Sequence, residues 1–449
     1  MRRSGLALVL AVLVILAGAG VLNNRYAATN PAPNPGAAGP TAQSSALYCT
    51  GLTNAHGDLR GLVTFINTTN ATRQVLVHAV ATNATSAVAT AFTLGPYARH
   101  VVTPTNLLVG DTYALAAQVD GGGVSAEQVV TRYGTTAPCV NEGVTNWYGS
   151  GFDTTVGSRA ILSVYNPTAT AAVFNVTTFS PSGFLSPAAL QGVSVGPHAE
   201  LALNLGDEVV ATQDFGAQVT VLRGSLVVVG DQISKGTASM NYGTSVLASA
   251  GTFPMVTTAN NAVAEVRVAN PGPATATVTV MVTLRKFNIA PQSTVVAAYH
   301  SAMITITPNT AIPAAGEASL TLTSDQPVDA TLATGTSNGV TLSPLGSPVA
   351  RAVLSDVTGG GFGEATMTNA SAAATTVTWS LLHHGALSAS GVTTVEPRTT
   401  VSIGALVHGR TKLRGSTLIM TSPTSSLVVN AILTTSPAGV TLASALNGG

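Results

Sequence analysis

The chain carries the same short pattern four times, at intervals of about 100 residues. In each copy an apolar stretch ends in an asparagine and small turn-forming residues, and a further apolar residue stands eight positions after the asparagine. Asparagine favours such turns because its side chain can hydrogen-bond the backbone two residues further on. Self-similarity at this spacing predicts repeated domain-sized units. The paired positions are Asn67 and Val75, Asn166 and Phe174, Asn270 and Val278, and Asn369 and Val377.

Within the units, apolar and polar residues alternate with a period of two. Val266 and Val268 alternate with Glu265 and Arg267, and the run 277–284 continues the pattern. This period is typical of half-buried antiparallel strands. Many short strands separated by turns are typical of a β-sandwich. A propeller is the alternative, but its blades repeat at about 40–50 residues.

Composition supports sheets and turns over long amphipathic helices. Apolar residues make up 45% of the chain and charged residues only 8%, with 45 Gly and 23 Pro. Long amphipathic helices need charged residues on their solvent-exposed face, and this chain has too few of them. We therefore predict an all-β fold of four tandem immunoglobulin-like antiparallel β-sandwich repeats, each of about 100 residues, after an N-terminal hydrophobic helix. The predicted repeats are 46–140, 141–249, 250–349 and 350–449.

Residues 1–22 have the pattern of a targeting segment. Arg2 and Arg3 precede Gly5–Leu22, a run of 18 residues without a charge. Such a run is either the core of a signal peptide or a single membrane-spanning signal anchor. In both cases the two arginines keep the N-terminus inside the cell. The rest is therefore expected outside the cytoplasm, either membrane-anchored through this helix or secreted after cleavage near Ala19.

Residues 23–45 contain four prolines and mostly small residues. Segments of this composition form extended, poorly packed linkers. We predict a Pro-rich linker between the hydrophobic segment and the first repeat.

The chain has two cysteines, Cys49 and Cys139, which bracket the first repeat. In an oxidising compartment an even pair of cysteines predicts a disulfide. Two free thiols and a metal-binding pair are the alternatives, and a zinc site is disfavoured because no histidine cluster accompanies the cysteines.

The charge balance limits the kinds of partner. Eighteen Lys and Arg balance 18 Asp and Glu, so the chain lacks the concentrated positive charge that binds a phosphate backbone. Nucleic acid is excluded as a partner on this ground. The expected partners are the membrane, through an uncleaved N-terminal helix, and an envelope glycan or protein.

No catalytic, cofactor or metal site is predicted. The sequence lacks H-E-x-x-H, the motif of zinc proteases. G-x-S-x-G occurs at 192–196 and 335–339, but the predicted β-repeats leave no room for the strand-to-helix turn on which serine hydrolases carry this motif. Asp207, Glu208, Asp214 and Asp153 are the acidic candidates for a glycosidase pair or a calcium site. We interpret them as residues of solvated turns.

The histidines are interpreted as ordinary surface or turn residues. His78 is expected on the solvent-exposed face of its strand. His383 and His384 are adjacent, so in a strand their side chains face opposite sides and cannot chelate one ion together.

Trp147 and Tyr148 form the one concentrated aromatic patch, together with Phe152. If exposed, Trp147 and Tyr148 are candidate ligand-stacking residues for sugar rings or a partner protein. If buried, they wedge the start of the second repeat against the first, and the glycan hypothesis loses its support from the sequence. We favour burial because aromatic residues are only 5% of the chain.

One stretch resembles a known group of proteins. It contains W-Y-G-S-G at 147–151, A-I-L-S-V-Y-N-P at 160–167 and L-V-V-V-G-D-Q at 226–232, with P-A-A-L-Q-G-V-S-V-G-P-H-A-E-L-A-L-N-L-G-D at 187–207 between them. This pattern resembles an uncharacterised family of extracytoplasmic actinobacterial proteins with an N-terminal anchor, a cysteine pair and β-rich repeats. The resemblance implies location and organisation, and it implies no functional residue.

These observations together predict a non-enzymatic, extracytoplasmic protein of the cell envelope that acts as a spacer, scaffold or interaction module. Two alternatives remain at this point. The first is an envelope glycan-binding protein that uses Trp147 and Tyr148, and the second is a glycan-active enzyme.

Overall fold

The structure is a computed structural model that describes most of the chain after residue 35. Among the described residues no helix is both long and apolar enough to cross a membrane. The predicted hydrophobic helix at 1–22 lies outside them. The described ranges are 36–37, 43–51, 61–82, 84, 87–110, 112–130, 135–234, 237–253, 263–284, 289–306, 318–336, 339–346, 348–355, 364–383, 385–403, 416–435, 439–444 and 446–448.

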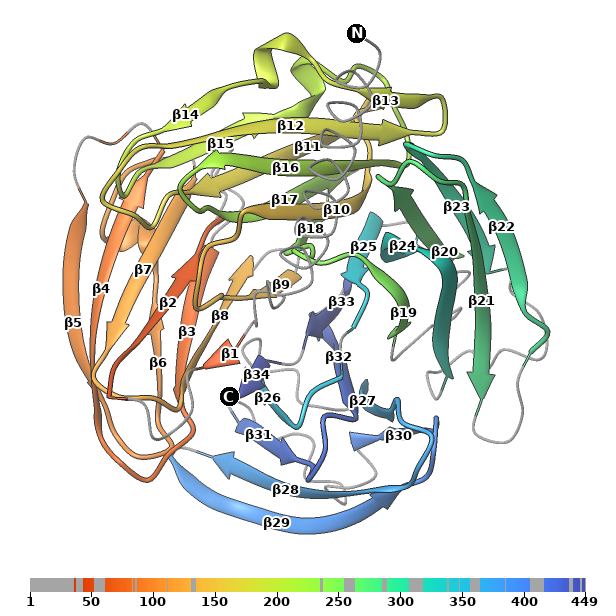
Figure 1. Ribbon diagram of the computed structural model, residues 1–449. Coiled ribbons are helices and arrows are strands. Elements are labelled where there is room, and N and C mark those ends of the chain that lie inside the picture. Colours follow the sequence, from red (N-terminus) through yellow and green to blue (C-terminus); the bar gives the residue numbers. More distant parts are fainter. Residues whose placement is uncertain are drawn as a thin grey trace, which may run out of the picture. The chain divides into compact units, whose positions relative to one another are not determined.

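The first module, as we call the elements from β2 to β9, consists of two four-stranded antiparallel sheets, ordered β2-β7-β4-β5 and β6-β3-β8-β9 (Figure 1). Alternate residues of both sheets, such as Val63, Phe65, Val77 and Leu115, fill the core between them. The elements are β2 (Ser45–Cys49), β3 (Gly61–Asn67), β4 (Arg73–Ala81), β5 (Val88–Leu94), β6 (Arg99–Val102), the 3₁₀ helix η1 (Pro104–Asn106), β7 (Tyr113–Val119), β8 (Val124–Val130) and β9 (Thr135–Pro138).

The second module runs from β10 to β18. One sheet has the order β10-β16-β12-β13, with β14 also paired to β12, and the other has the order β15-β11-β17-β18. The elements are β10 (Asn146–Phe152), β11 (Ser158–Tyr165), β12 (Ala172–Ser180), β13 (Gly183–Leu185), η2 (Ala188–Leu190), β14 (Val193–Val195), β15 (Glu200–Asn204), η3 (Leu205–Asp207), β16 (Phe215–Arg223), β17 (Val227–Ser234) and β18 (Thr237–Asn241).

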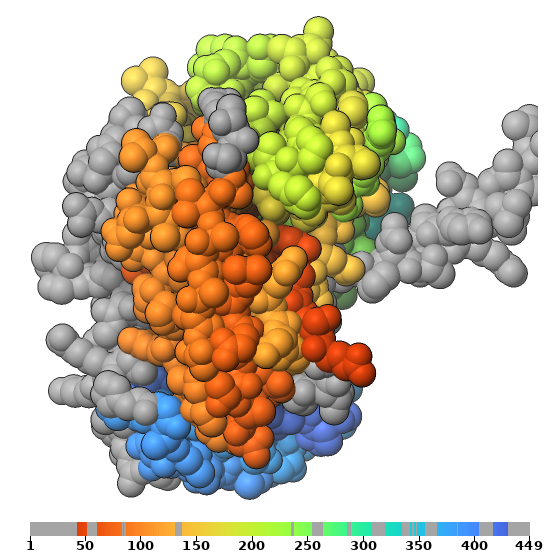
Figure 2. Space-filling view, turned by 90° about the vertical axis from the view of Figure 1, so that its left-hand side faces the viewer, coloured from red at the N-terminus to blue at the C-terminus, as the bar shows by residue number. Residues whose placement is uncertain are grey.

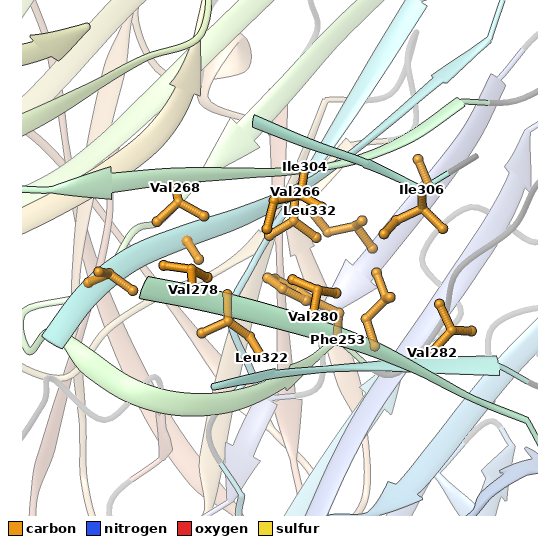
Figure 3. Close-up of a cluster of buried hydrophobic side chains, with 14 of the residues drawn as sticks. Phe253, Val266, Val268, Val278, Val280, Val282, Ile304, Ile306, Leu322 and Leu332 are labelled. Carbon is orange, nitrogen blue, oxygen red and sulfur yellow. The ribbon is translucent and has the colours of Figure 1, made fainter. Parts of the chain in front are cut away.

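The third module runs from β19 to β25 and is joined by one long strand, β24. The first part of β24 pairs with β21 and β19, and its second part pairs with β20 and β25. Figure 3 shows the core of this module, in which Val266, Val280 and Leu332 from three strands pack together. The strands are β19 (Ala248–Phe253), β20 (Val263–Asn270), β21 (Ala276–Leu284), β22 (Gln292–Val296), β23 (His300–Ile306), β24 (Ala318–Thr336) and β25 (Gly339–Pro344).

The fourth module contains β26 to β34 and the short N-terminal strand β1. Its sheets have the orders β1-β34-β26-β31-β28-β29 and β30-β27-β32-β33. The predicted linker 23–45 thus contains two residues that pair with the C-terminal strand. The strands are β1 (Gly36–Ala37), β26 (Arg351–Ser355), β27 (Glu364–Asn369), β28 (Thr375–His383), β29 (Ala386–Val395), β30 (Thr400–Ser402), β31 (Ser416–Thr421), β32 (Leu427–Thr435), β33 (Gly439–Ser444) and β34 (Leu446–Gly448).

The prediction of an all-β, antiparallel sandwich architecture is confirmed, and the strand order differs from that of an immunoglobulin domain. In the first module β2 pairs with β7, and β8 pairs with both β3 and β9. An immunoglobulin constant domain has the orders ABED and CFG instead. The predicted repeat boundaries remain predictions.

The four repeat asparagines occupy an equivalent turn, as predicted. Each side chain is fully buried. Its Nδ2 donates to the carbonyl oxygen four residues on and to two carbonyl oxygens where a later strand ends, and its Oδ1 accepts from the backbone N–H two residues on. In Asn166 these acceptors are the carbonyl oxygens of Thr170, Val195 and Gly196, and the N–H is that of Thr168. Asn67, Asn270 and Asn369 make the same bonds.

Cys49 and Cys139 form the predicted disulfide, with their Cα atoms 4.6 Å apart. Cys49 ends β2 in one sheet of the first module, and Cys139 follows β9 in the other. Both side chains lie in the core. The bond therefore joins the two sheets and closes a loop that contains almost the whole module.

The modules also contact one another through one edge strand of each. β9 contacts β18, β18 contacts β25, β25 contacts β33, and β33 contacts β9 (Figure 1). On the sheets that contain these strands, the face opposite the core is therefore covered in part by other modules. Polar residues on such a face need hydrogen-bond partners from a neighbouring module.

Candidate functional site at the junction of the first two modules

The first and second modules meet over an apolar cluster. Val80 and Ala114 of the first module pack against Tyr165 and Val227 of the second, and all four side chains are buried. Figure 2 shows the two modules in direct contact, the first in orange and the second in yellow and green. This cluster positions the polar groups on either side of it.

Two buried carboxyl groups lie beside the apolar cluster. Glu200, at the start of β15, is 4% exposed, and Asp231, in β17, is 3% exposed. The Thr50 hydroxyl of the first module donates to Glu200 Oε1 at 3.2 Å, and the Ser163 hydroxyl donates to Asp231 Oδ2 at 3.1 Å. Burial raises the pKa of Glu200 well above its usual range, and Asp231 raises it further. Burial therefore favours the protonated form of Glu200 more than water does for an exposed glutamate.

Tyr165 and Tyr48 face each other across the same junction. Their ring centroids are 6.1 Å apart with an angle of 39° between the ring planes. Burial raises the pKa of Tyr165 to about 12, with smaller contributions from Tyr48 and Glu200. Burial also raises the pKa of Tyr48. Both phenols consequently stay uncharged under physiological conditions.

A pocket of about 320 Å³ opens where the two tyrosines meet the surface. Its lining includes Tyr48, His78, Ala116 and Gln118 from the first module, and Tyr165 and His198 from the second. Ala116 belongs to β7, and His198 lies in the turn that follows β14. This pocket is the feature at the junction that is open to a small ligand.

The junction of the second and third modules is closed by charge and hydrogen bonds. Arg267, in β20, pairs with Asp214 of the second module at 3.0 Å and donates to the carbonyl oxygen of Gly151 at 3.1 Å. The Ser150 hydroxyl donates to the Thr331 hydroxyl at 3.0 Å across the same junction. Asp214, one of the predicted acidic candidates, thus has a structural partner.

Asp329, in β24, is a third buried carboxyl group. Its Oδ2 has no hydrogen-bond partner. Burial raises its pKa to about 6, while the Ser150 hydroxyl and the Ala330 N–H lower it. The carboxyl group also interacts with Tyr148 of the second module, whose pKa is raised by burial and then by Asp329.

The raised pKa of Asp329 predicts a loss of stability as the pH rises. Because the group binds its proton more tightly in the folded state, its contribution is full below its ordinary pKa of 3.8 and is lost as the pH passes 6. We expect the unfolding free energy of the third module to fall by about 2 kcal/mol from pH 4 to pH 7 through this group. Asp329→Asn should remove that part of the pH dependence in denaturant titrations. Equal slopes for wild type and variant would contradict it.

Of the two alternatives for the aromatic patch at Trp147, the structure shows the buried one. Trp147 is 2% exposed in the core of the second module, and its Nε1 donates to the carbonyl oxygen of Tyr242 at 2.8 Å. Phe152 is fully buried beside it. Tyr148 is half-buried and accepts a 3.4 Å hydrogen bond from Gln218. The face of Trp147 is therefore not available to stack on a sugar, and the glycan hypothesis loses its basis at this position.

The remaining acidic candidates lie in turns. Asp207 is exposed and accepts from the Asn204 side chain at 2.7 Å, and Glu208 follows it at the end of η3. Asp153 Oδ1 accepts from the N–H and the hydroxyl of Thr155. These contacts fit the interpretation as turn residues.

The histidines stand apart from any metal-binding arrangement in the described part of the chain. No group of three His, Cys, Asp or Glu side chains there is placed to hold a metal ion. His383 bonds the Ser416 hydroxyl at 3.1 Å, and His384 lies outside the described residues. His78 is half-buried at the pocket.

Sequence reasoning missed the junction residues themselves. Glu200 and Asp231 each carry a charge on a strand that is otherwise free of charge. Tyr165 directly precedes a repeat asparagine, where the other repeats have Ile66, Ala269 and Thr368. These signals mark unusual positions, but the identity of the neighbouring module that buries them depends on tertiary contacts.

Comparison with known proteins gives one family match. A model described as a family of unknown function (DUF5719) matches residues 116–405. No curated protein matches the chain.

Several solved structures show distant likeness. A tetra-tandem repeat in the extending region of a large adhesion protein has 13% identity and a TM-score of 0.13 over 90% of this chain and 100% of that chain. The exo-chitosanase CsxA of Amycolatopsis orientalis has 12% identity and a TM-score of 0.14 over 48% of this chain and 26% of the enzyme. The α-L-rhamnosidase of Streptomyces avermitilis has 10% identity and a TM-score of 0.15 over 73% and 46%. TM-scores this low support no argument about fold or function.

Proposed function

The chain belongs to a family of unknown function, DUF5719, and we propose that it is a non-enzymatic structural protein of the cell envelope. In this role it acts outside the cytoplasm as a spacer, scaffold or interaction module. The N-terminal segment 1–22 anchors it in the membrane, or is cleaved so that the protein is secreted.

The observation that carries this proposal is that the ionisable groups at the junctions are enclosed between modules. Glu200 and Asp231 lie at the first junction, and Asp329 and Arg267 lie at the second. These side chains are enclosed between modules, where a substrate does not reach them, and their partners come largely from the neighbouring module. Ionisable side chains that an enzyme would place in an open cleft are here buried at the junctions, where Glu200 accepts a hydrogen bond from Thr50 of the first module and Arg267 pairs with Asp214 of the second.

The disulfide supports the location. Disulfides persist in oxidising compartments and are rare in the bacterial cytoplasm. Cys49 and Cys139 are paired in the core, and the uncharged run Gly5–Leu22 precedes them in the sequence. Both features fit export.

Location is tested in a bacterium that encodes this chain, by comparing the full chain with a variant that lacks residues 1–22. We expect the full chain in the envelope fraction, labelled by a membrane-impermeant reagent and without free thiols. The truncated variant should remain in the cytoplasm with both thiols free. Equal distribution of the two proteins would contradict the proposal.

The structural role is tested by gene deletion and complementation. We expect the deletion to raise envelope permeability to detergent. Wild type should restore the barrier, and so should Ala386→Ile, a control at an exposed position of β29. Tyr165→Lys should not, because it places a charge within the apolar junction. The purified full chain should release no product from chromogenic glycosides. Turnover by the purified chain would overturn the non-enzymatic assignment.

A further inference from the structure

The pocket at the first junction exists because a repeated inter-module contact is altered there. In each repeat a later turn, about 30 residues after the asparagine, contains a large residue in the left-handed backbone region. These residues are Tyr97, His198, Tyr299 and Arg398, with φ between 50° and 62°. The backbone N–H of Tyr97 donates to Thr69 O, and that of His198 donates to Thr168 O. Non-glycine residues rarely adopt this conformation, so the turn holds its side chain in a fixed direction.

This direction is toward another module. Tyr97 packs with Ile66 on a cluster of the fourth module. Tyr299 of the third module contacts Phe184 of the second, with ring centroids 5.7 Å apart. His198 faces the first module at the pocket. The same turn therefore forms a contact at three junctions, with a smaller ring at the first.

Strand register identifies the equivalent positions on the receiving sheets. In the fourth module Ile419 pairs with Val353 on one side and Ser380 on the other. In the first module Ala116 pairs with Tyr48 on one side and His78 on the other. Ala116 thus occupies the place of Ile419. The positions of Val353 and Ser380 are occupied by Tyr48 and His78.

Two reductions in side-chain size leave the space open. Where Ile66 and Tyr97 meet Ile419 the surfaces close into a buried cluster. At the first junction His198 replaces the tyrosine and Ala116 replaces the isoleucine, and a pocket of about 320 Å³ remains beside Tyr48 and Tyr165. The pocket is thus a local departure from the closed contact that the first module makes with the fourth.

We propose that this pocket binds one uncharged sugar ring. None of the described residues that line it is Lys, Arg, Asp or Glu, so a charged ligand would find no countercharge. The half-buried Tyr48 offers a ring surface for the apolar face of a pyranose. His78, His198 and Gln118 offer donors and acceptors for its hydroxyl groups.

The size of the pocket and its polar groups separate a sugar from other neutral ligands. Small-molecule pockets span roughly 300–1,000 Å³, so this pocket suits a single ring at the lower end of that range. A purely apolar ligand would desolvate two imidazoles and an amide without replacing their hydrogen bonds. A pyranose offers an apolar face to the tyrosine surface and hydroxyl groups to the polar side chains.

Saturation-transfer NMR on the full chain tests the inference, with glucose, galactose, mannose and N-acetylglucosamine as probes and glucuronic acid as the charged comparison. We expect binding of at least one neutral sugar, with an affinity that is insensitive to salt because charge does not contribute. Ala116→Ile and His198→Tyr restore the residues of the closed junction. Each should weaken binding more than about tenfold while the fold is retained.

Ala386→Ile is the matched control, since it makes the same substitution at an exposed position of the fourth module. It should bind like the wild type. Failure of all four neutral sugars to bind, or binding that persists unchanged in Ala116→Ile and His198→Tyr, would overturn the inference. Tighter binding of glucuronic acid than of the neutral sugars would overturn it as well. The inference does not rest on the scaffold role, so its failure leaves the complementation experiment to be judged separately.

Discussion

Replacing both Cys49 and Cys139 by alanine should lower the unfolding free energy of the first module by roughly 4–5 kcal/mol. The disulfide joins residues 90 positions apart, so in the chain-entropy account it removes a large part of the freedom of the unfolded module. Alanine is used because both side chains lie in the core, where a serine hydroxyl would need a partner.

Hydrogen exchange of first-module peptides under increasing denaturant measures this effect, because it separates one module from the rest of the chain. Reduction of the wild-type disulfide should reproduce the loss seen in the double variant. The other modules should change less, since the bond lies within the first. Equal protection of first-module amides in the wild type and the double variant would show that the bond contributes nothing.

Asn166→Ala should destabilise the second module by roughly 3–5 kcal/mol. The side chain makes three donated and two accepted hydrogen bonds while fully buried, with partners on Thr168, Thr170, Val195 and Gly196. Alanine leaves these backbone groups without a partner at the place where the turn meets the end of β14.

Asn175→Ala is the control, in the same module and with the same change of residue. Asn175 makes a single exposed hydrogen bond, from the N–H of Gly192 at 2.7 Å, and its loss should cost less than about 1 kcal/mol. Thermal unfolding followed by hydrogen exchange of second-module peptides compares the two variants. Similar losses for Asn166→Ala and Asn175→Ala would refute a special role for the repeat asparagine.

Local sequence patterns were sufficient to predict the strands and the asparagine turn of each repeat. Alternation in 277–284 predicted β21, whose Val278, Val280 and Val282 face the core. The asparagine pattern predicted the turn because all its acceptors lie on nearby strands of the same repeat. The cysteine pair was predictable for a similar reason, since both residues flank one module.

The order of the strands in each sheet could not be predicted from these local patterns. Alternation shows which face of a strand is buried, but it is the same for either neighbour in a sheet. The pairing of β2 with β7 and of β8 with β9 therefore differs from the expected immunoglobulin order. The pairing of Gly36–Ala37 with β34 joins segments from opposite ends of the chain, which no local pattern reports.

The candidate site could not be predicted from the sequence either, because it too depends on contacts between segments that are far apart in the chain. Tyr48 and Tyr165 are far apart in the chain, and neither residue shows from its own repeat that the other will pack against it. The aromatic concentration at Trp147 was the stronger signal, and the buried alternative that we favoured for it is the one observed.

The sequence by itself determined the elements that depend on neighbours along the chain: an all-β composition, period-two strands, the asparagine turns and the pairing of two cysteines. Only the tertiary structure decided which faces are covered by another module, that Glu200 and Asp329 lose their water there, and that a pocket remains beside Ala116. The physical reason is that desolvation and packing at a junction depend on side chains from two modules at once. A change in size at one position has no consequence until the opposite surface is known.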